Sequence, residues 1–129
     1  MGSDLAQALL EGDRAALDAL LAPDAVFHSP VRTYRDRSDV LHLLALIGSV
    51  LGTDAEATRS WLGETGSAAW LTSTQPEGRL DGVLTETRDG QGLVHEVALL
   101  LRPVKVMLAT IGRMGAALEA APLPSAAPR

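Results

Sequence analysis

The chain has no cysteine and very few aromatic side chains, and both shortages exclude kinds of site. Its 129 residues include two Trp, one Tyr and one Phe. Without thiols the protein can form no disulfide, no thiolate metal site and no cysteine nucleophile, which fits a reducing compartment. The N-terminus also lacks the apolar stretch of a signal peptide, so we expect a cytoplasmic protein.

Charge and hydropathy exclude further classes of partner. The net charge of −5 argues against a nucleic-acid partner, which usually requires a basic patch. The longest apolar run, residues 40–51, is interrupted by His42 and Gly48 and is too short to cross a bilayer. The three histidines do not have the spacing of metal ligands. We therefore expect no membrane partner, no metal and no cofactor.

The N-terminal third of the chain has the apolar spacing of three helices. The first is expected over residues 4–11 with Ser3 as its N-cap, and the second begins after Asp13 and ends before Pro23. The third is expected to begin with Ser38 as its N-cap. A helical start of this kind predicts a layer of helices that must cover another apolar surface.

Strand signals dominate the second half of the chain. Runs separated by Gly, Pro and Asp turns predict strands over residues 25–28, 55–63, 68–75, 79–88 and 93–102. Pro103 fits the first position of a final helix, and a strand through residues 104–106 is the alternative. The sequence therefore predicts one α+β domain over residues 4–121, followed by a disordered Pro- and Ala-rich tail over residues 122–129.

Side chains of the predicted strands sort onto two unlike faces. The register proposed from the turns pairs Thr74 with Arg79 and Arg88 with Leu93. One face is then polar and carries Trp70, Thr72, Asp81, Glu96 and Arg102, with Glu96 opposite Thr85. The other face is aliphatic and carries Leu80, Leu84, Val97, Leu99 and Leu101. In this register Asp81 and Arg102 are diagonal neighbours within reach of a salt bridge.

Five short segments at the boundaries of the predicted helices and strands resemble those of a known protein family. They are Gly12-Asp13, residues 21–30 (LAPDAVFHSP), Tyr34-Arg35-Asp36, Arg88-Asp89-Gly90 and Leu101-Arg102-Pro103. With the order of elements, they make the chain similar to the nuclear transport factor two-like superfamily, and above all to its SnoaL-like, polyketide cyclase-like members. The resemblance implies a cone-shaped fold with N-terminal helices packed on a curved antiparallel sheet. It also implies a small hydrophobic molecule as ligand and a homodimer formed through one sheet face.

The residues that carry catalysis in the enzymes of this superfamily are mostly missing. By resemblance, the general base of the ketosteroid isomerases falls at Ser29, which cannot act as a base without a partner. Their oxyanion-stabilising Tyr falls near Leu5, and the His-x-Asp pair of the cyclases falls near Glu96 and Ala98. An Arg-x-Asp pair ending at Asp81 has the spacing found in the epoxide hydrolases, but it lies one strand too late. The resemblance therefore implies a fold without an inherited mechanism.

A candidate site remains on the polar sheet face. Asp81 and Glu96 would form a catalytic pair of carboxylates if burial raised the pKa of one of them. The alternative is a solvated sheet face with an Asp81–Arg102 bridge. We expect the polar face to line a cavity, with Ser29, Tyr34, Trp70, Thr72 and Arg102 as ligand-binding residues.

Two classes of function stay open. The first is an enzyme that acts on a hydrophobic, oxygenated metabolite by proton transfer, cyclisation or hydration. The second is a non-catalytic ligand-binding or dimerisation module. A water-lined cavity containing Asp81 and Glu96 would favour the enzyme, and a cavity filled by Leu and Val would favour the module. Because the aliphatic sheet face is too apolar to be exposed, either helices or a second subunit must cover it, and we expect a homodimer.

Overall fold

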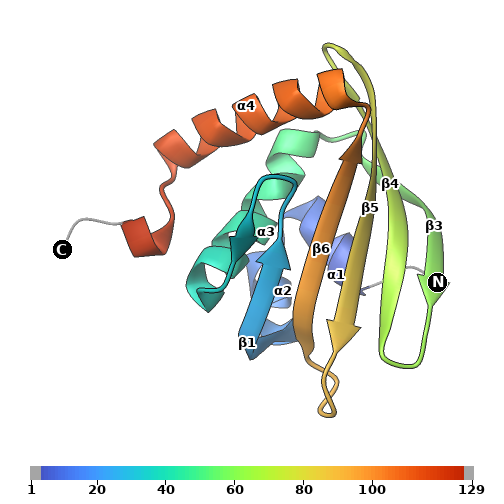
Figure 1. The fold of residues 1–129 in the computed structure, drawn as a ribbon, viewed down its shortest axis with the longest axis vertical. Coiled ribbons are helices and arrows are strands. Elements are labelled where there is room, and N and C mark those ends of the chain that lie inside the picture. The colour runs from blue at the N-terminus through green and yellow to red at the C-terminus, as the bar shows by residue number, and fades with distance from the viewer. Residues whose placement is uncertain (1–3, 127–129) are drawn as a thin grey trace.

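Helices cover one face of a single curved sheet in a computed structural model that describes residues 4–126 (Figure 1). The helical elements are α1 (Asp4–Glu11), α2 (Arg14–Leu20), α3 (Arg37–Leu51), α4 (Val104–Ala120) and the short 3-10 turn η1 (Pro124–Ala126). The strands are β1 (Leu21–His28), β2 (Thr33–Tyr34), β3 (Glu56–Leu62), β4 (Gly66–Gln75), β5 (Gly78–Arg88) and β6 (Val94–Arg102). The predicted α+β architecture is confirmed, and α4 excludes a strand through residues 104–106.

The sheet is mixed, whereas the sequence predicted an antiparallel one. Its strand order is β2-β1-β6-β5-β4-β3, with β1 parallel to β6 and the other neighbours antiparallel. Parallel neighbours require a long connection, and the chain between β1 and β6 contains α3 and the four strands β2, β3, β4 and β5. The two-residue strand β2 is too short to give a periodic signal, and the sequence did not predict it.

The predicted register is confirmed on one side of β5 and shifted on the other. Thr74 pairs with Arg79 in β4 and β5, as predicted from the turn between them. In β5 and β6, however, Glu96 lies opposite Thr87, two residues from its predicted partner Thr85. The five-residue turn closed by a hydrogen bond between Asp89 N and the Leu93 carbonyl, and an irregularity in β6, account for this shift.

The two-residue shift leaves the residues named above for each face on that face, because side chains alternate along a strand with a period of two. The aliphatic face is concave and lies under the helices, where Leu80, Leu84, Val97 and Leu99 are buried and Leu101 is half-buried. Helices therefore cover this face, and a second subunit cannot use it as an interface.

Close approach of α1 to α3 fixes the helical layer over the sheet. A Cβ atom at Gly48 would lie 2.4 Å from the Leu9 carbonyl oxygen and 2.9 Å from that of Leu10. Only glycine permits this distance between the two helix backbones. Leu9 and Leu44 are fully buried beneath this contact, so the apolar stripes of α1 and α3 join the concave sheet face in one core.

Helix starts follow the expected capping chemistry at one position and differ at another. Asp13 caps α2 by accepting from the Ala16 N–H at 3.1 Å, as predicted. The cap of α3 is Asp36, which accepts from the Asp39 N–H at 3.1 Å, so the prediction of Ser38 is wrong. Ser38 instead donates to Asp36, and this hydrogen bond, with that of the Asp39 N–H, lowers the Asp36 pKa. Ser3, predicted to cap α1, lies outside the described residues.

Part of the predicted tail contacts the domain. Ser125 donates from its backbone N–H and its hydroxyl to the Asp39 carboxylate, at 3.0 and 2.6 Å. The His42 ring lies 2.7 Å from the Ala121 carbonyl oxygen, just beyond the end of α4. Residues 127–129 of the predicted tail lie outside the described residues. Residues 122–126 therefore hold the C-terminal end of α4 against α3.

Candidate ligand-binding cavity

A cavity of about 180 Å³ lies between α3, α4, the β1–β2 hairpin and the concave sheet face. Cavities of about 150 Å³ in protein cores bind benzene, so this space can hold a single small ring. Sites for drug-sized ligands measure about 300–1,000 Å³, so this space is smaller than a typical site of that kind. The cavity is lined by Phe27, Ser29, Pro30, Val31, Tyr34, Leu43, Ile47, Val50, Leu51, Leu99, Leu101, Thr110, Ile111, Met114, Gly115 and Leu118.

Two of the polar groups in this wall, the Ser29 and Thr110 hydroxyls, already have partners within the chain. The Ser29 hydroxyl donates to the Arg32 carbonyl at 2.9 Å and accepts from the N–H groups of Val31 and Arg32. The Thr110 hydroxyl donates to the Val106 carbonyl at 2.8 Å. The lining includes no Asp, Glu, His, Lys or Arg. Without such a group the wall has no general acid or base near neutral pH, so it favours apolar ligands over reactive polar ones.

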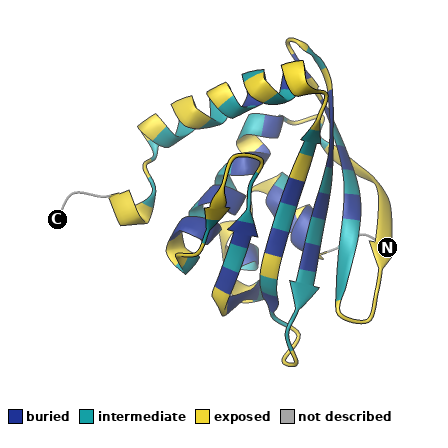
Figure 2. Cartoon of the chain, in the orientation of Figure 1, coloured by how far each residue is buried: buried dark blue, intermediate teal, exposed yellow. Residues whose placement is uncertain are grey.

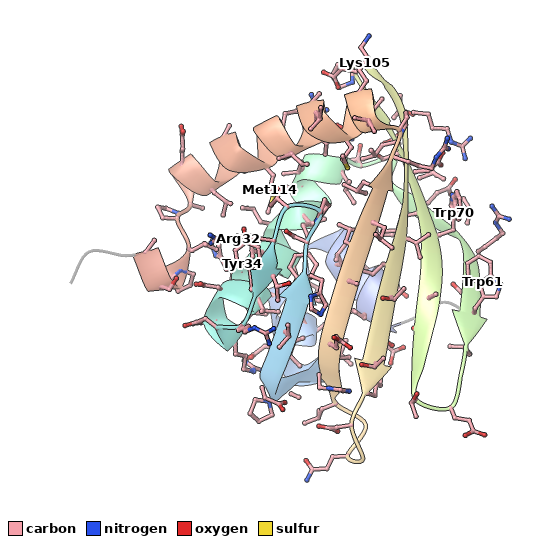
Figure 3. The ribbon with its side chains drawn as sticks, in the orientation of Figure 1. Arg32, Tyr34, Trp61, Trp70, Lys105 and Met114 are labelled. Carbon is pink, nitrogen blue, oxygen red and sulfur yellow. The ribbon has the colours of Figure 1, made fainter. Side chains whose placement is uncertain are left out.

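Two aromatic rings form the end of the cavity at the β1–β2 hairpin. Phe27 is buried in β1, and its ring stacks on that of Tyr34 in β2 with the centroids 6.4 Å apart. The Arg32 guanidinium lies 4.6 Å from the Tyr34 ring centroid on the outer side of the hairpin. Figure 3 shows Tyr34 and Arg32 here, with Met114 on the side of α4 that faces the hairpin. Aromatic and aliphatic groups thus meet around one space.

An ion pair holds the α4 wall of the cavity against the sheet. The Arg113 guanidinium donates to both Glu77 carboxylate oxygens, at 2.9 and 2.8 Å, and to the Gln75 side chain at 2.8 Å. The hydrogen bond from Arg113 lowers the Glu77 pKa, and the same bond raises the Arg113 pKa. This contact joins the middle of α4 to the β4–β5 turn, so it fixes the height of the helix above the sheet.

Most of the predicted site residues lie on the opposite face of the sheet from this cavity. Ser29 and Tyr34 line it, but Trp70, Thr72, Asp81, Glu96 and Arg102 do not. Thr72 borders a niche of about 10 Å³, which is about the size of one water molecule. The prediction that the polar face lines the cavity is therefore wrong. This cavity lies between the helices and the aliphatic face that they cover.

On the outer face, Asp81 is the centre of a charge cluster. Its carboxylate accepts from Trp70 Nε1 at 3.3 Å and from Arg79 Nε at 3.0 Å, and it lies 3.7 Å from Arg102 Nη1. The predicted Asp81–Arg102 bridge is confirmed, with the two residues directly opposite in the register. The Asp81 side chain is 12% exposed, while both guanidinium groups remain largely in water. Figure 3 shows Trp70 and Trp61 on β4 and β3, far from Tyr34 and Met114.

The two predicted catalytic carboxylates lie far apart. Asp81 pairs with Arg102, and Glu96 pairs with Thr87. The six-residue separation between Asp81 and Thr87 corresponds to about 20 Å along the strand. A pair of carboxylates acting on one substrate atom requires a much shorter separation. The register therefore excludes Asp81 and Glu96 from one acid/base pair.

Glu96 instead joins a chain of hydrogen bonds that the sequence did not predict. Its carboxylate lies 2.8 Å from His28 Nε2, and His28 Nδ1 lies 2.8 Å from the Thr33 hydroxyl. Only the parallel pairing of β1 with β6 brings these residues together. About half of the Glu96 side chain is exposed, and none of the three residues lines the cavity. These hydrogen bonds connect the β1–β2 hairpin to β6 on the solvent-exposed face of the sheet.

A buried carboxylate also lies at the far end of the sheet. Glu86 is 5% exposed and accepts from the Ser67 hydroxyl and from Arg88 at 3.0–3.1 Å. Its position on the concave face among aliphatic neighbours was the only available signal. Over residues 4–126, no three His, Cys, Asp or Glu side chains group closely enough to hold a metal ion. Glu86 therefore has a structural role, in a salt bridge with Arg88.

Comparison with solved structures identifies the fold. Neither a protein-family model nor a curated protein matches the chain. An uncharacterized bacterial protein with a cystatin-like fold from Silicibacter pomeroyi DSS-3 is similar with a TM-score of 0.84 and 24% identity, over 92% of this chain and 84% of that one. A steroid delta-isomerase from Pseudomonas aeruginosa has a TM-score of 0.81 and 22% identity, over 93% and 95% of the two chains.

A further similar structure is an NTF2-like protein of unknown function from Cytophaga hutchinsonii ATCC 33406, with a TM-score of 0.64, 8% identity and coverage of 81% and 88%. The chain thus has the nuclear transport factor two-like fold that the sequence resembled, a cone of helices on a curved sheet. At these identities the similarity defines the fold and no activity. None of the helices within residues 4–126 is long and apolar enough to span a membrane.

Proposed function

We propose that this protein binds a small apolar molecule, no larger than a single ring with short substituents, in the cavity beneath α4. The observation that carries the proposal is the wall of the cavity, which combines aliphatic and aromatic side chains with no charged group, and in which the Ser29 and Thr110 hydroxyls already have partners. Burying an unpaired polar group of a ligand there would cost free energy, so the wall selects against charged and strongly polar molecules.

We further propose that binding in this cavity is not accompanied by acid–base catalysis. Ser29 stands where the resemblance places a general base, and its hydroxyl is held by three hydrogen bonds within its own turn. A wall of Leu, Ile, Val and Met favours the binding module over the enzyme. The similar fold of a protein called a steroid delta-isomerase supports an apolar ligand, although the cavity here suits a smaller one.

The remaining predictions of role and location stay proposals. Catalytic roles for Asp81 and Glu96 would have to be separate, because the register places the two carboxylates about 20 Å apart. Ligand contacts by Trp70, Thr72 and Arg102 would require a second molecule on the outer sheet face. A cytoplasmic location is supported by the lack of cysteine, and a homodimer by exposed apolar side chains such as Leu62, Leu100 and Leu108.

Toluene and benzoate are suitable probes, since they have similar size and differ in charge. We expect toluene to shift the methyl resonance of Met114 and to raise the melting temperature, and benzoate to do neither. The substitution Met114→Trp should fill the cavity and abolish the toluene effect. Leu108→Trp, on the exposed side of the same helix, is the matched control and should retain it. Equal responses to both probes, or an unchanged response in Met114→Trp, would contradict the proposal.

A further inference from the structure

The wall of the cavity contains three hydroxyl groups, those of Ser29, Tyr34 and Thr110. A hydroxyl has one proton to donate, and two of these protons are already used. The Ser29 and Thr110 hydroxyls each donate to a nearby backbone carbonyl oxygen, at 2.9 and 2.8 Å. The Tyr34 side chain has ring contacts, but its hydroxyl forms no hydrogen bond with any group among residues 4–126. The Tyr34 proton is therefore available to a ligand.

The Tyr34 ring is held in place by two neighbours. Phe27, which is buried, stacks on it with an interplanar angle of 21°. Arg32, which is exposed, places its guanidinium over the ring at 4.6 Å from the centroid. Contacts on the faces of a ring restrict its motion and leave the edge that carries the hydroxyl free. A hydroxyl positioned in this way loses little further conformational freedom when it binds a ligand.

The cavity opens to solvent beside the β1–β2 hairpin. Val31 lines the cavity and is also 60% exposed. Gly115 of α4 lines it too, and a Cβ atom there would have no neighbour within 4 Å. Figure 2 shows this hairpin at one edge of the sheet, with several of its positions exposed. Tyr34 is half-buried and its hydroxyl is not sealed from water, so a small molecule entering here can reach it.

A positive charge beside the Tyr34 ring favours donation by its hydroxyl. The Arg32 guanidinium takes part in none of the ion pairs found among residues 4–126. A cation over the ring draws electron density from it, which makes the hydroxyl a stronger donor and a weaker acceptor. The matching ligand group is therefore an acceptor oxygen. A carboxylate would have to leave water for a wall without a charged group, so a neutral oxygen is favoured.

We propose that Tyr34 determines the ligand class by donating a hydrogen bond to one neutral carbonyl oxygen on a single-ring compound, such as an aryl ketone. The inference rests on the proposed function, because it concerns the same cavity. The aliphatic wall holds the ring, and the hydroxyl at the hairpin end fixes its orientation. The Tyr that the resemblance places near Leu5 would belong to α1, where Leu5 is fully buried, so the Tyr34 hydroxyl comes from a different part of the fold.

Acetophenone and α-methylstyrene test the proposal, since they have nearly the same shape and differ only in C=O against C=CH2. We expect Tyr34→Phe to weaken acetophenone binding by about tenfold, because the carbonyl oxygen loses its donor. The same substitution should change the dissociation constant of α-methylstyrene by less than about twofold, because this ligand has no oxygen to accept a hydrogen bond. Titration of the methyl resonance of Met114, which lines the cavity, measures all the constants.

The infrared carbonyl band of bound acetophenone is a second readout, which a merely structural role of Tyr34 would not change. A hydrogen bond to the oxygen lowers the frequency of this band, so the wild type should give a lower frequency than Tyr34→Phe. Thr110→Val is the matched control, because it removes a wall hydroxyl whose proton is already used. It can change both dissociation constants but should leave their ratio as in the wild type. Melting temperatures check that each variant is folded.

The outcomes separate this inference from the proposed function. If the wild type binds neither compound, both fail. If it binds α-methylstyrene but not acetophenone, or if Tyr34→Phe leaves the ratio of the two constants unchanged, the inference alone fails and the apolar cavity stands. A change of ratio in Thr110→Val as large as in Tyr34→Phe would have the same meaning. Should Tyr34→Phe not fold, a wild-type carbonyl band at the frequency found in an alkane would still overturn the inference.

Discussion

The cavity predicts that two directly paired leucines differ in their contribution to stability. Leu84 in β5 and Leu99 in β6 are opposite each other in the register, lie on the concave face and are 3% and 4% exposed. Only Leu99 lines the cavity. A side chain that borders empty space has fewer atoms in contact with it than one enclosed on all sides, so its removal forfeits less dispersion energy.

Replacement of each leucine by alanine turns this difference into a measurement. A Leu→Ala change in a protein core costs about 2–5 kcal/mol. We expect Leu84→Ala to lie in the upper part of this range, at about 4 kcal/mol, and Leu99→Ala in the lower part, at about 2–3 kcal/mol. Because both residues occupy central strands and the substitution is the same, differences in strand propensity largely cancel.

Equilibrium unfolding in urea, followed by far-UV circular dichroism, measures the two variants. For a domain of this size the slope is about 2 kcal/mol per molar urea, so a difference of 1 kcal/mol separates the midpoints by about 0.5 M. The slopes themselves must agree for the comparison to hold. If Leu99→Ala proves as destabilising as Leu84→Ala or more so, the space beside Leu99 is packed in solution, and the argument for a ligand cavity fails.

Three further predictions concern other parts of the molecule. Gly48→Ala should destabilise the protein by at least about 3 kcal/mol, because its Cβ would clash with backbone atoms of α1. Gly115→Ala has open space around it and should stabilise α4 by about 0.5–1 kcal/mol. Chemical denaturation of dilute protein measures both changes in the free energy of unfolding. The hydrogen bond from Arg113 lowers the Glu77 pKa, so the stability it contributes is present above the unfolded value of about 4.5 and is lost as the pH falls below it towards the folded value. Glu77→Gln should flatten the pH dependence of the urea midpoint in that range, and an unchanged profile would show that the pair is not formed. Asp81→Ala should cost about 1–2 kcal/mol in thermal unfolding and leave toluene binding unchanged, because its two arginine partners remain hydrated and the residue lies outside the cavity; loss of toluene binding would contradict the assignment of faces.

Local patterns in the sequence determined much of the fold. The Pro-Glu-Gly turn after Gln75 fixed the pairing of Thr74 with Arg79, because a short turn leaves little freedom in the register it closes. Alternation along β5 and β6 separated an aliphatic face from a polar one, and this separation survived a shift of two residues. Asp13 capped its helix as expected, since capping depends only on atoms within one turn of the chain.

Long-range contacts decided the site. The parallel pairing of β1 with β6 brings His28 beside Glu96 across a separation of 68 residues, and no local pattern reports such a contact. An irregularity near His95 moved Glu96 away from its predicted partner. The distance between Asp81 and Glu96 follows from this register, and it removed the predicted catalytic pair.

The cavity itself is a property of the assembled molecule. It exists where side chains of α3, α4, β1 and β6 fail to fill the space above the concave sheet face. Sequence alone showed that this face is apolar and must be covered. Whether the covering helices close on it completely depends on how side-chain volumes from distant segments fit together, and only the tertiary structure decides that fit.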